Sequence, residues 1–136
     1  VLVHRKGATR ACGPGRSEVP AIYRDVGQPV IIGGSMETGS YLLAGTDGAM
    51  QQTFGSTCHG SGRTMSRTRA KQLWRGDKLQ RDMEKRGIYV KTTSFSGLAE
   101  EAGGAYKDID EVIDAVHNAG ISKKVVKFSP IGNVKG

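Results

Sequence analysis

The sequence predicts an α+β fold, with strands and helices mixed in one unit. Three observations carry this prediction: short apolar runs that end at glycine, a long stretch free of glycine and proline, and one segment with clear helical periodicity. The 136 residues suit a single domain. Because 37% of them are hydrophobic and 24% are charged, the composition favours a folded chain over a disordered one.

The first half of the chain is predicted to consist of strands and loops. Residues 1–3 are apolar and strand-like, and we interpret them as the middle of an element, so a fragment or a processed piece is expected. Residues 29–32 and 41–44 are short, partly β-branched runs that end at glycine, which predicts two buried strands. The glycine-rich stretch 47–62 is predicted to be a loop.

Helices are predicted to follow. Residues 63–75 contain good helix formers and neither glycine nor proline. Residues 77–86 predict a second helix, with Asp77 as its N-cap and Gly87 after its last turn. Residues 88–93 alternate in the manner of a strand.

The last third of the chain has the clearest pattern. Asp108 is a candidate N-cap for a helix that Gly120 closes. The apolar positions of this helix fit a period of 3.6 residues, and they are Ile109, Val112, Ile113 and Val116. Residues 125–128 then predict a strand that ends before Pro130.

The charge of the protein is concentrated in one segment. Ten basic and three acidic residues lie between Arg63 and Lys91, so this segment alone accounts for the whole net charge of +7. Such a block points to a polyanionic partner, a nucleic acid or a nucleotide. The alternative is a solvated helix face with no partner. No apolar run reaches the ~20 residues that cross a bilayer, so no membrane partner is expected.

The cysteines and histidines do not suggest a self-contained metal site. Cys12 and Cys58 stand in no metal-binding spacing, and the three histidines are scattered along the chain. We therefore expect no metal ligands here and a reducing compartment. A Cys58–His59 nucleophilic pair is disfavoured, because adjacent side chains usually point apart.

The sharpest feature is a histidine among small residues. His59 precedes Gly60 and Gly62, and Arg63 follows at the start of a predicted helix. Glycines let the backbone approach a bulky anion, a helix N-terminus attracts one, and arginine binds phosphate oxygens with two hydrogen bonds. Histidine is also a known covalent nucleophile. From spacing alone, a histidine that donates to a phosphate or caps a turn is the better interpretation.

Two further segments are candidate anion sites. Residues 32–41 form a glycine-rich turn that contains Ser35 and Ser40, but it has neither the Walker A order nor a GxGxxG order. A tight turn with positive φ explains it at least as well as phosphate binding. Residues 4–10 gather several cations after a strand-like start, and a solvated loop would look similar.

These motifs together resemble a known family. The segments that carry the resemblance are 3–11 (VHRKGATRA), 27–30 (GQPV), 59–67 (HGSGR, then MSR) and 134–136 (VKG). Over essentially its whole length, the chain resembles the C-terminal portion of the RtcB-type RNA ligases. These enzymes act in tRNA splicing and RNA repair, and they join RNA ends with a 3′-phosphate or 2′,3′-cyclic phosphate to 5′-hydroxyl ends.

The resemblance implies roles for particular residues. It implies that His59 attacks GTP and carries GMP, and that Ser40, Tyr106 and Lys135 contact the guanine base. The implied nucleotide-binding set is Ser35, Ser40, Gly60, Ser61, Gly62, Tyr106 and Lys135. The implied RNA-phosphate contacts are Lys6, Arg63 and Arg67. Two positions depart from the family pattern, since Glu37 replaces a glycine and Cys12-Gly13 replaces an aromatic–proline pair.

The resemblance also limits the activity that is expected of this chain alone. The manganese ligands of the family precede the segment that matches Val1 onward, so residues 1–136 are expected to be the GTP- and RNA-facing portion without the N-terminal metal-binding part. The isolated chain is expected to be inactive. Expected partners are tRNA halves, GTP, the N-terminal part of the same enzyme and an activating protein. The expected location is the cytoplasm, or also the nucleus if the source is a eukaryote. The alternative function is a non-catalytic basic RNA-binding module, which would have no need of His59.

Overall fold

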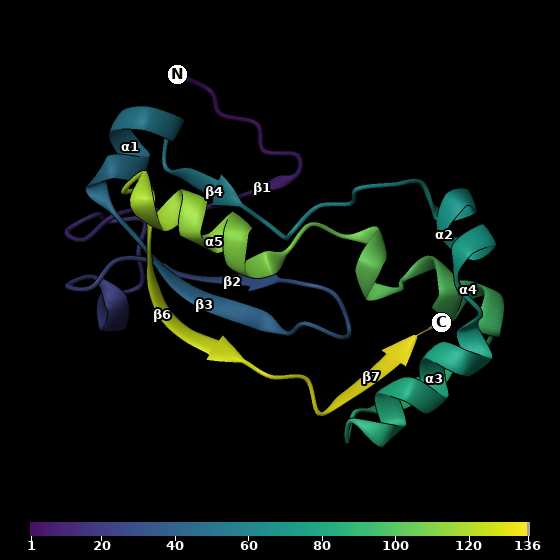
Figure 1. Ribbon diagram of the computed structural model, residues 1–136. Helices are drawn as coiled ribbons and strands as arrows, with labels where there is room; N and C mark the ends of the chain where they lie inside the picture. Colours follow the sequence, from purple (N-terminus) through teal and green to yellow (C-terminus); the bar gives the residue numbers. More distant parts are fainter. Residues whose placement is uncertain (136) are drawn as a thin grey trace.

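The computed structural model describes residues 1–135 and has the mixed α+β architecture that the sequence predicts (Figure 1). Its strands are β1 Ala8–Arg10, β2 Pro29–Gly33, β3 Ser40–Gly45, β4 Ser56–Cys58, β5 Tyr89–Thr92, β6 Ser122–Phe128 and β7 Gly132–Lys135. Its α-helices are α1 Asp47–Thr53, α2 Arg67–Leu73, α3 Gly76–Lys85, α4 Phe95–Glu100 and α5 Ile109–Asn118. Short 3-10 turns span Ala21–Tyr23 and Gly103–Ala105.

One hydrophobic core lies between an antiparallel sheet and helix α5. The sheet has the strand order β2-β3-β6, and α5 covers one of its faces (Figure 1). Alternate residues of β2 and β3 point to this face, as a half-buried sheet requires. The core side chains are Ala11, Val30, Ile32, Tyr41, Leu43, Ala49, Ile109 and Ile113. Strands β1 and β4 form a separate two-stranded antiparallel ladder.

Helix α5 confirms the helix that was predicted between Asp108 and Gly120. The side chain of Asp108 caps the helix by accepting the backbone N–H of Asp110 over 2.7 Å. Ile109 and Ile113 are buried, so the periodic apolar face is the face that packs on the sheet. Gly120 follows the helix with a φ of 70°, a conformation that favours glycine.

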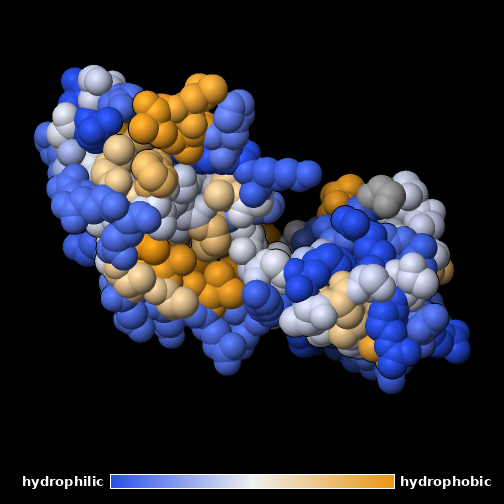
Figure 2. Space-filling model, turned by 90° about the horizontal axis from the view of Figure 1, so that it is seen from above, coloured by the Kyte–Doolittle hydropathy of each residue, from blue (hydrophilic) through white to orange (hydrophobic). Residues whose placement is uncertain are grey.

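A second hydrophobic core lies among helices α3 and α4 and the parallel strand pair β5–β7. Its buried residues are Met36, Leu79, Met83, Ile88, Val90, Leu98 and Ala102, and Trp74 packs against it. Figure 2 shows two bodies joined by a narrower region. In this view the body with α2, α3 and α4 presents a mostly hydrophilic face, in keeping with the concentrated basic charge.

The prediction of a loop over residues 47–62 is wrong, because α1 and β4 lie within it. Thr46 caps α1 by accepting the backbone N–H of Ala49, and Phe54 ends it with a φ of 52°. Two glycines of this stretch, Gly48 and Gly55, permit close packing and do not mark a loop. A Cβ atom on Gly48, for example, would collide with the carbonyl oxygen of Gly120.

The helix expected over 63–75 begins only at Arg67, where Ser66 caps it. Residue Arg63 is instead extended and forms an isolated antiparallel bridge with Tyr106. The arrangement expected at His59, with a helix N-terminus directly after the loop, is therefore absent from the described chain. The cause is a long-range backbone pairing that helix propensity does not reveal.

Other boundaries differ in smaller ways. The helix expected over 77–86 begins at Gly76, so Arg75 is the N-cap and Asp77 lies in the first turn, where Arg75 and Arg81 pair with it. The strand expected over 88–93 is confirmed as β5. The strand expected over 125–128 begins three residues earlier, at Ser122.

Some elements were not predicted, and one expected element is absent. Helix α4 and strand β7 have no counterpart among the sequence-based expectations. Residues 1–3, expected to be strand-like, lie outside the strands that the structure describes, with Val1 and Leu2 exposed.

Candidate functional site

The candidate nucleophile, His59, directly follows strand β4. That strand pairs with β1, and the pairing places Ala8 opposite Cys58. Cys58 packs against the first core, and burial raises the pKa of its thiol. The side chain of His59 is exposed, and within residues 1–135 it makes no hydrogen bond. Neither a Cys–His bond nor a shared environment therefore links the two neighbours.

The loop after His59 is hydrogen-bonded to the end of β2. Gly33 and Gly60 form a parallel bridge, and the backbone N–H of Ser61 donates to the carbonyl oxygen of Gly33 over 3.0 Å. Gly62 has a φ of 75°, which turns the chain toward Arg63. The two glycine-rich segments that the sequence offered as separate anion sites are thus one structural unit.

The second glycine-rich segment is a tight hydrogen-bonded turn. Ser35 is buried, its Oγ lies 3.0 Å from Thr38 Oγ1, and it accepts the backbone N–H of Glu37. Gly39 has a φ of 99° and faces the carbonyl oxygen of Phe128 so closely that a Cβ would collide with it. A cavity of about 170 Å³ opens beside this turn, lined by residues that include Ser35, Ser40, Phe128, Pro130 and Asn133.

The arginine after the loop is held by several partners. Arg63 Nη1 donates to the Tyr106 hydroxyl over 2.9 Å, and Nη2 donates to the carbonyl oxygen of Glu100 over 2.7 Å. Its Nε donates to the carbonyl oxygen of Met65, and its guanidinium lies 4.8 Å from the centre of the Tyr106 ring. Arg63 therefore connects the loop to the segment that carries Tyr106.

Two neighbouring carboxylates, Glu100 and Glu101, form ion pairs with the other cationic side chains expected at the site, Arg67 and Lys135. The Tyr106 hydroxyl donates to Glu101 Oε2 over 2.6 Å, and Lys135 Nζ lies 3.5 Å from the same oxygen. Arg67 Nε lies 3.5 Å from Glu100 Oε2. Four residues expected to contact nucleotide or RNA thus meet at this acidic pair, and they are Arg63, Tyr106, Arg67 and Lys135.

The pKa values in this cluster follow from its burial and charges. Burial by itself raises the pKa of Glu101, but the Tyr106 hydrogen bond and the charges of Lys135 and Arg63 outweigh it, so the pKa lies below its ordinary value. Burial first, and then the carboxylate of Glu101, raises the pKa of the Tyr106 phenol. Near neutral pH the pair is therefore a phenol that donates to a carboxylate.

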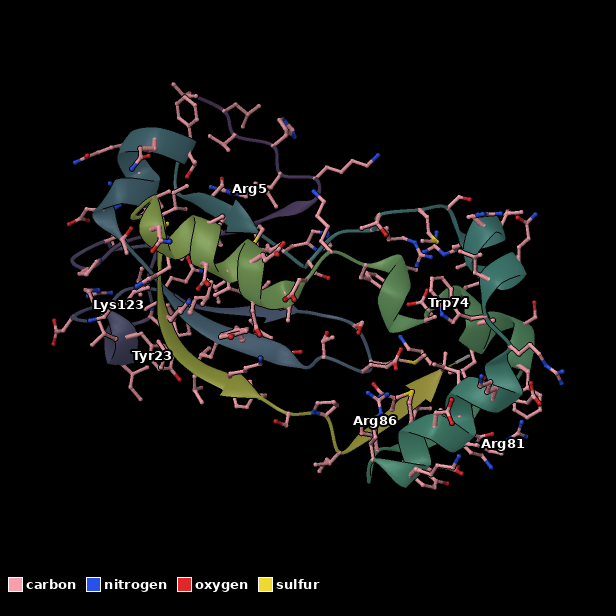
Figure 3. All side chains as sticks on the ribbon, in the orientation of Figure 1. Arg5, Tyr23, Trp74, Arg81, Arg86 and Lys123 are labelled. Atoms are coloured by element: carbon pink, nitrogen blue, oxygen red, sulfur yellow. The ribbon has the colours of Figure 1, made fainter. Side chains whose placement is uncertain are left out.

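The cations near the N-terminus lie apart from this cluster. Arg5 Nε donates to Ser56 Oγ over 2.8 Å, and its Nη2 donates to the carbonyl oxygen of Phe54 over 3.0 Å. Figure 3 shows Arg5 beside strands β1 and β4, far from Trp74 and Arg86 in the other body. Lys6 is exposed and forms no ion pair with any described residue.

Both departures from the family pattern have a structural explanation. Glu37 Oε2 accepts the backbone N–H of Gly103 over 2.5 Å, and Arg86 Nη2 donates to Glu37 Oε1 over 2.6 Å, so the extra negative charge is neutralised. Cys12 is buried, and Gly13 lies so close to the start of α1 that a Cβ would collide with Asp47. Both positions are thus accommodated by contacts within this fold.

One polar side chain of the histidine loop is buried without a partner. The Oγ atom of Ser61 makes no hydrogen bond to any described residue, although Ser61 is only 4% exposed. A buried hydroxyl in that state costs folding free energy, and the same holds for the hydroxyls of Thr57 and Ser122. Residues 1–135 contain no cluster of three His, Cys, Asp or Glu side chains that would hold a metal ion. None of the helices described for this chain is both long and apolar enough to cross a membrane.

Sequence reasoning missed Glu100 and Glu101, which end helix α4 and follow it. The available signal was an adjacent pair of acids after a strongly basic block. Their role emerges only when the fold brings Arg63 and Tyr106 together, 43 residues apart in the chain.

Comparison with known proteins gives a consistent result. The family model described as tRNA-splicing ligase RtcB matches residues 1–136. Over all 136 residues the chain is 61% identical to the tRNA-splicing ligase RtcB of Archaeoglobus fulgidus, 58% to that of Pyrococcus horikoshii and 55% to that of Methanococcus maripaludis. It spans 28%, 16% and 28% of the lengths of these relatives. On this match across its full length, the chain belongs to the RtcB family of tRNA-splicing ligases.

Proposed function

We propose that this chain is the GTP- and RNA-facing C-terminal portion of an RNA ligase that acts in tRNA splicing and RNA repair. The observation that carries the proposal is the position of His59. Its exposed imidazole stands on a loop that is hydrogen-bonded to a second glycine-rich turn, and Arg63 continues that loop into a cluster of cations. The relatives named tRNA-splicing ligase support the same function.

The proposed chemistry begins with a nitrogen atom of His59. The imidazole attacks the α-phosphorus of GTP, so that an N–P bond forms and the P–O bond to pyrophosphate breaks. GMP then passes from His59 to the 3′-phosphate of an RNA end, and the imidazole is released. The 5′-hydroxyl of the second RNA attacks the activated phosphorus, a phosphodiester forms and GMP leaves.

The proposed binding roles follow the two glycine-rich segments and the cation cluster. Backbone and hydroxyl groups of the segments would hold the nucleotide, and they belong to Ser35, Ser40, Gly60, Ser61 and Gly62. Tyr106 and Lys135 would contact the base, because both lie at the edge of the cluster. Arg67 is the best placed of the RNA contacts, since two thirds of its side chain is exposed. Arg63 and Lys6 would complete the RNA-phosphate set.

The complete enzyme would need partners beyond these residues. We place the proposed manganese ligands in the N-terminal part of the same enzyme, because the family resemblance puts them before the segment that matches Val1 onward. The proposed substrates are tRNA halves with 3′-phosphate (or cyclic phosphate) and 5′-hydroxyl ends, together with GTP. An activating protein and a cytoplasmic location, or also a nuclear one in a eukaryote, complete the proposal.

The test uses a complete ligase, made by joining this segment to the remaining part of the Archaeoglobus fulgidus relative. Incubation with GTP labelled at the α-phosphorus and Mn²⁺ should yield a protein–GMP adduct stable to denaturation. The change His59→Ala should abolish the adduct, whereas His117→Ala, on the last turn of α5, should retain it. An adduct that survives His59→Ala removes this residue from its role. The isolated chain of 136 residues should form no adduct.

A non-catalytic RNA-binding module is the second candidate, and the exposed cations of α2 and α3 favour it. Arg67, Arg75 and Arg81 are each more than 60% exposed at the side chain. Such a module would bind RNA with strong salt dependence, and GTP would not affect it. RNA binding without any GMP adduct in the complete ligase would favour this candidate.

A further inference from the structure

We propose that Glu101 is a positioning residue for the nucleotide base, because its carboxylate holds Tyr106 and Lys135 against one oxygen atom. The inference rests on the proposed function, since it concerns the same site. It adds a residue for which neither the sequence motifs nor the family resemblance implies any role.

The geometry that supports this role is the sharing of Glu101 Oε2. The Tyr106 hydroxyl donates to this oxygen over 2.6 Å, and Lys135 Nζ lies 3.5 Å from it. Tyr106 follows the 3-10 turn Gly103–Ala105, whereas Lys135 ends strand β7. The two side chains therefore come from separate elements, and the carboxylate is the described group that bonds to both.

Holding these side chains in advance assists binding in two ways. A lysine side chain has many rotamers, so fixing its ammonium group before the nucleotide arrives removes part of the entropic cost of binding. The phenol ring is fixed by its hydroxyl on one side and by Arg63 across its face. A ring that is already fixed can present its other surface to a base.

The charge of the cluster remains suitable for an anionic ligand. Arg63, Arg67, Lys71 and Lys135 surround the two carboxylates of Glu100 and Glu101. The cations outnumber the acids, so the carboxylates arrange the cations without cancelling their attraction for phosphate. Because the pKa of Glu101 is depressed, its carboxylate stays ionised at neutral pH.

The experiment compares two changes at this position in the complete ligase. E101A removes both the hydrogen-bond acceptors and the charge, whereas E101Q keeps one amide oxygen as an acceptor for Tyr106, removes the charge and replaces the other oxygen with an NH2 donor. For E101A we expect the KM for GTP in adduct formation to rise about tenfold, the loss typical of one charge-assisted contact. The preference for GTP over ATP should fall by a similar factor, while kcat stays within about threefold.

The KM of E101Q for GTP should lie between the values of wild type and E101A and should be measurably above that of wild type. If E101A fails to fold, the KM of E101Q alone decides the test. The matched control is D82N on α3, where Asp82 pairs with exposed Lys85 and not with the site. This control should leave KM, kcat and base preference unchanged.

The outcomes separate this inference from the function on which it rests. If the folded variants keep the wild-type KM and base preference, or if only kcat or the active fraction falls, the positioning role is overturned. If wild-type ligase forms no adduct, or if the adduct survives His59→Ala, the proposed function fails instead.

Discussion

The backbone N–H of Ser61 donates to the carbonyl oxygen of Gly33 over 3.0 Å, which ties the histidine loop to the end of strand β2. Together with the bridge between Gly33 and Gly60, the bond places the backbone that follows His59 at the start of the turn that carries Ser35 and Ser40. The Ser61 hydroxyl itself is buried and has no hydrogen-bond partner among residues 1–135.

The first prediction concerns this hydroxyl. Ser61→Ala should raise the free energy of unfolding by about 1 kcal/mol, because it removes a buried polar atom that makes no hydrogen bond. If the nucleotide uses the hydroxyl, the same change should raise the KM for GTP. Chemical denaturation and adduct kinetics measure the two effects. Thr57→Val is the matched control, since Thr57 Oγ1 is also buried and unpartnered but belongs to β4, so only its stability should rise.

The second prediction concerns Glu37. Glu37→Ala should lower the free energy of unfolding by about 1 to 3 kcal/mol, because the Gly103 N–H loses its acceptor and Arg86 loses its partner. Asp82→Ala, which breaks an exposed pair with Lys85, should cost less than about 0.5 kcal/mol. Equal stability of the two variants in urea unfolding would show that the Glu37 contacts contribute nothing.

The third prediction distinguishes two arginines of the same motif. Arg63→Ala should lower the free energy of unfolding by about 2 kcal/mol, because Arg63 donates to two carbonyl oxygens and a phenol. Arg63→Lys should not restore it, since an ammonium group cannot reproduce the planar fork of donors.

Arg67→Ala should leave stability nearly unchanged, because its side chain is 66% exposed. It should instead reduce the slope of log affinity for single-stranded RNA against log salt by about 0.7. Fluorescence anisotropy over a salt series measures the slope. A wild-type slope in the Arg67 variant would remove this residue from the RNA contacts.

The fourth prediction concerns acid. Burial opposes ionisation of Glu101, yet the Tyr106 hydrogen bond and the charges of Lys135 and Arg63 keep its pKa below 4.5 in the folded protein. A depressed pKa contributes stability above the unfolded value, and this contribution disappears as the pH falls through the folded value. The stability advantage of wild type over E101Q should therefore be constant above the ordinary pKa of a glutamate side chain and shrink as the pH falls below it. Urea unfolding at several pH values measures it, and an advantage that grows in acid would contradict the assignment.

The parts of the fold that sequence predicted well are those with local causes. Helix α5 has its cap, its apolar period and its closing glycine within one short segment, so nearby residues determine it. Strand β7 was missed because GNVK has little strand character of its own and forms by pairing with distant β5. Helix α1 was missed because Gly48, which packs against Gly120, resembles a loop glycine.

The candidate site likewise combines features with local causes and features that depend on long-range contacts. His59 and its glycines were recognisable because the whole motif is contiguous, and the structure joins it to the second glycine turn through Gly33. The carboxylate of Glu101 was not recognisable, since its partners come from separate elements. Residues whose partners lie far away in the chain are not revealed by the spacing of motifs in the sequence.

The two hydrophobic cores have a mechanical consequence. His59 follows a strand packed beside the first core, whereas Arg67 lies on α2, which packs on α4 beside the second. The separation between His59 and Arg67 is therefore set by the segments that cross from one core to the other. Under the proposed function, in which Arg67 holds an RNA end and His59 carries GMP, the distance between these two residues would therefore depend on how stiffly those crossing segments hold the two cores.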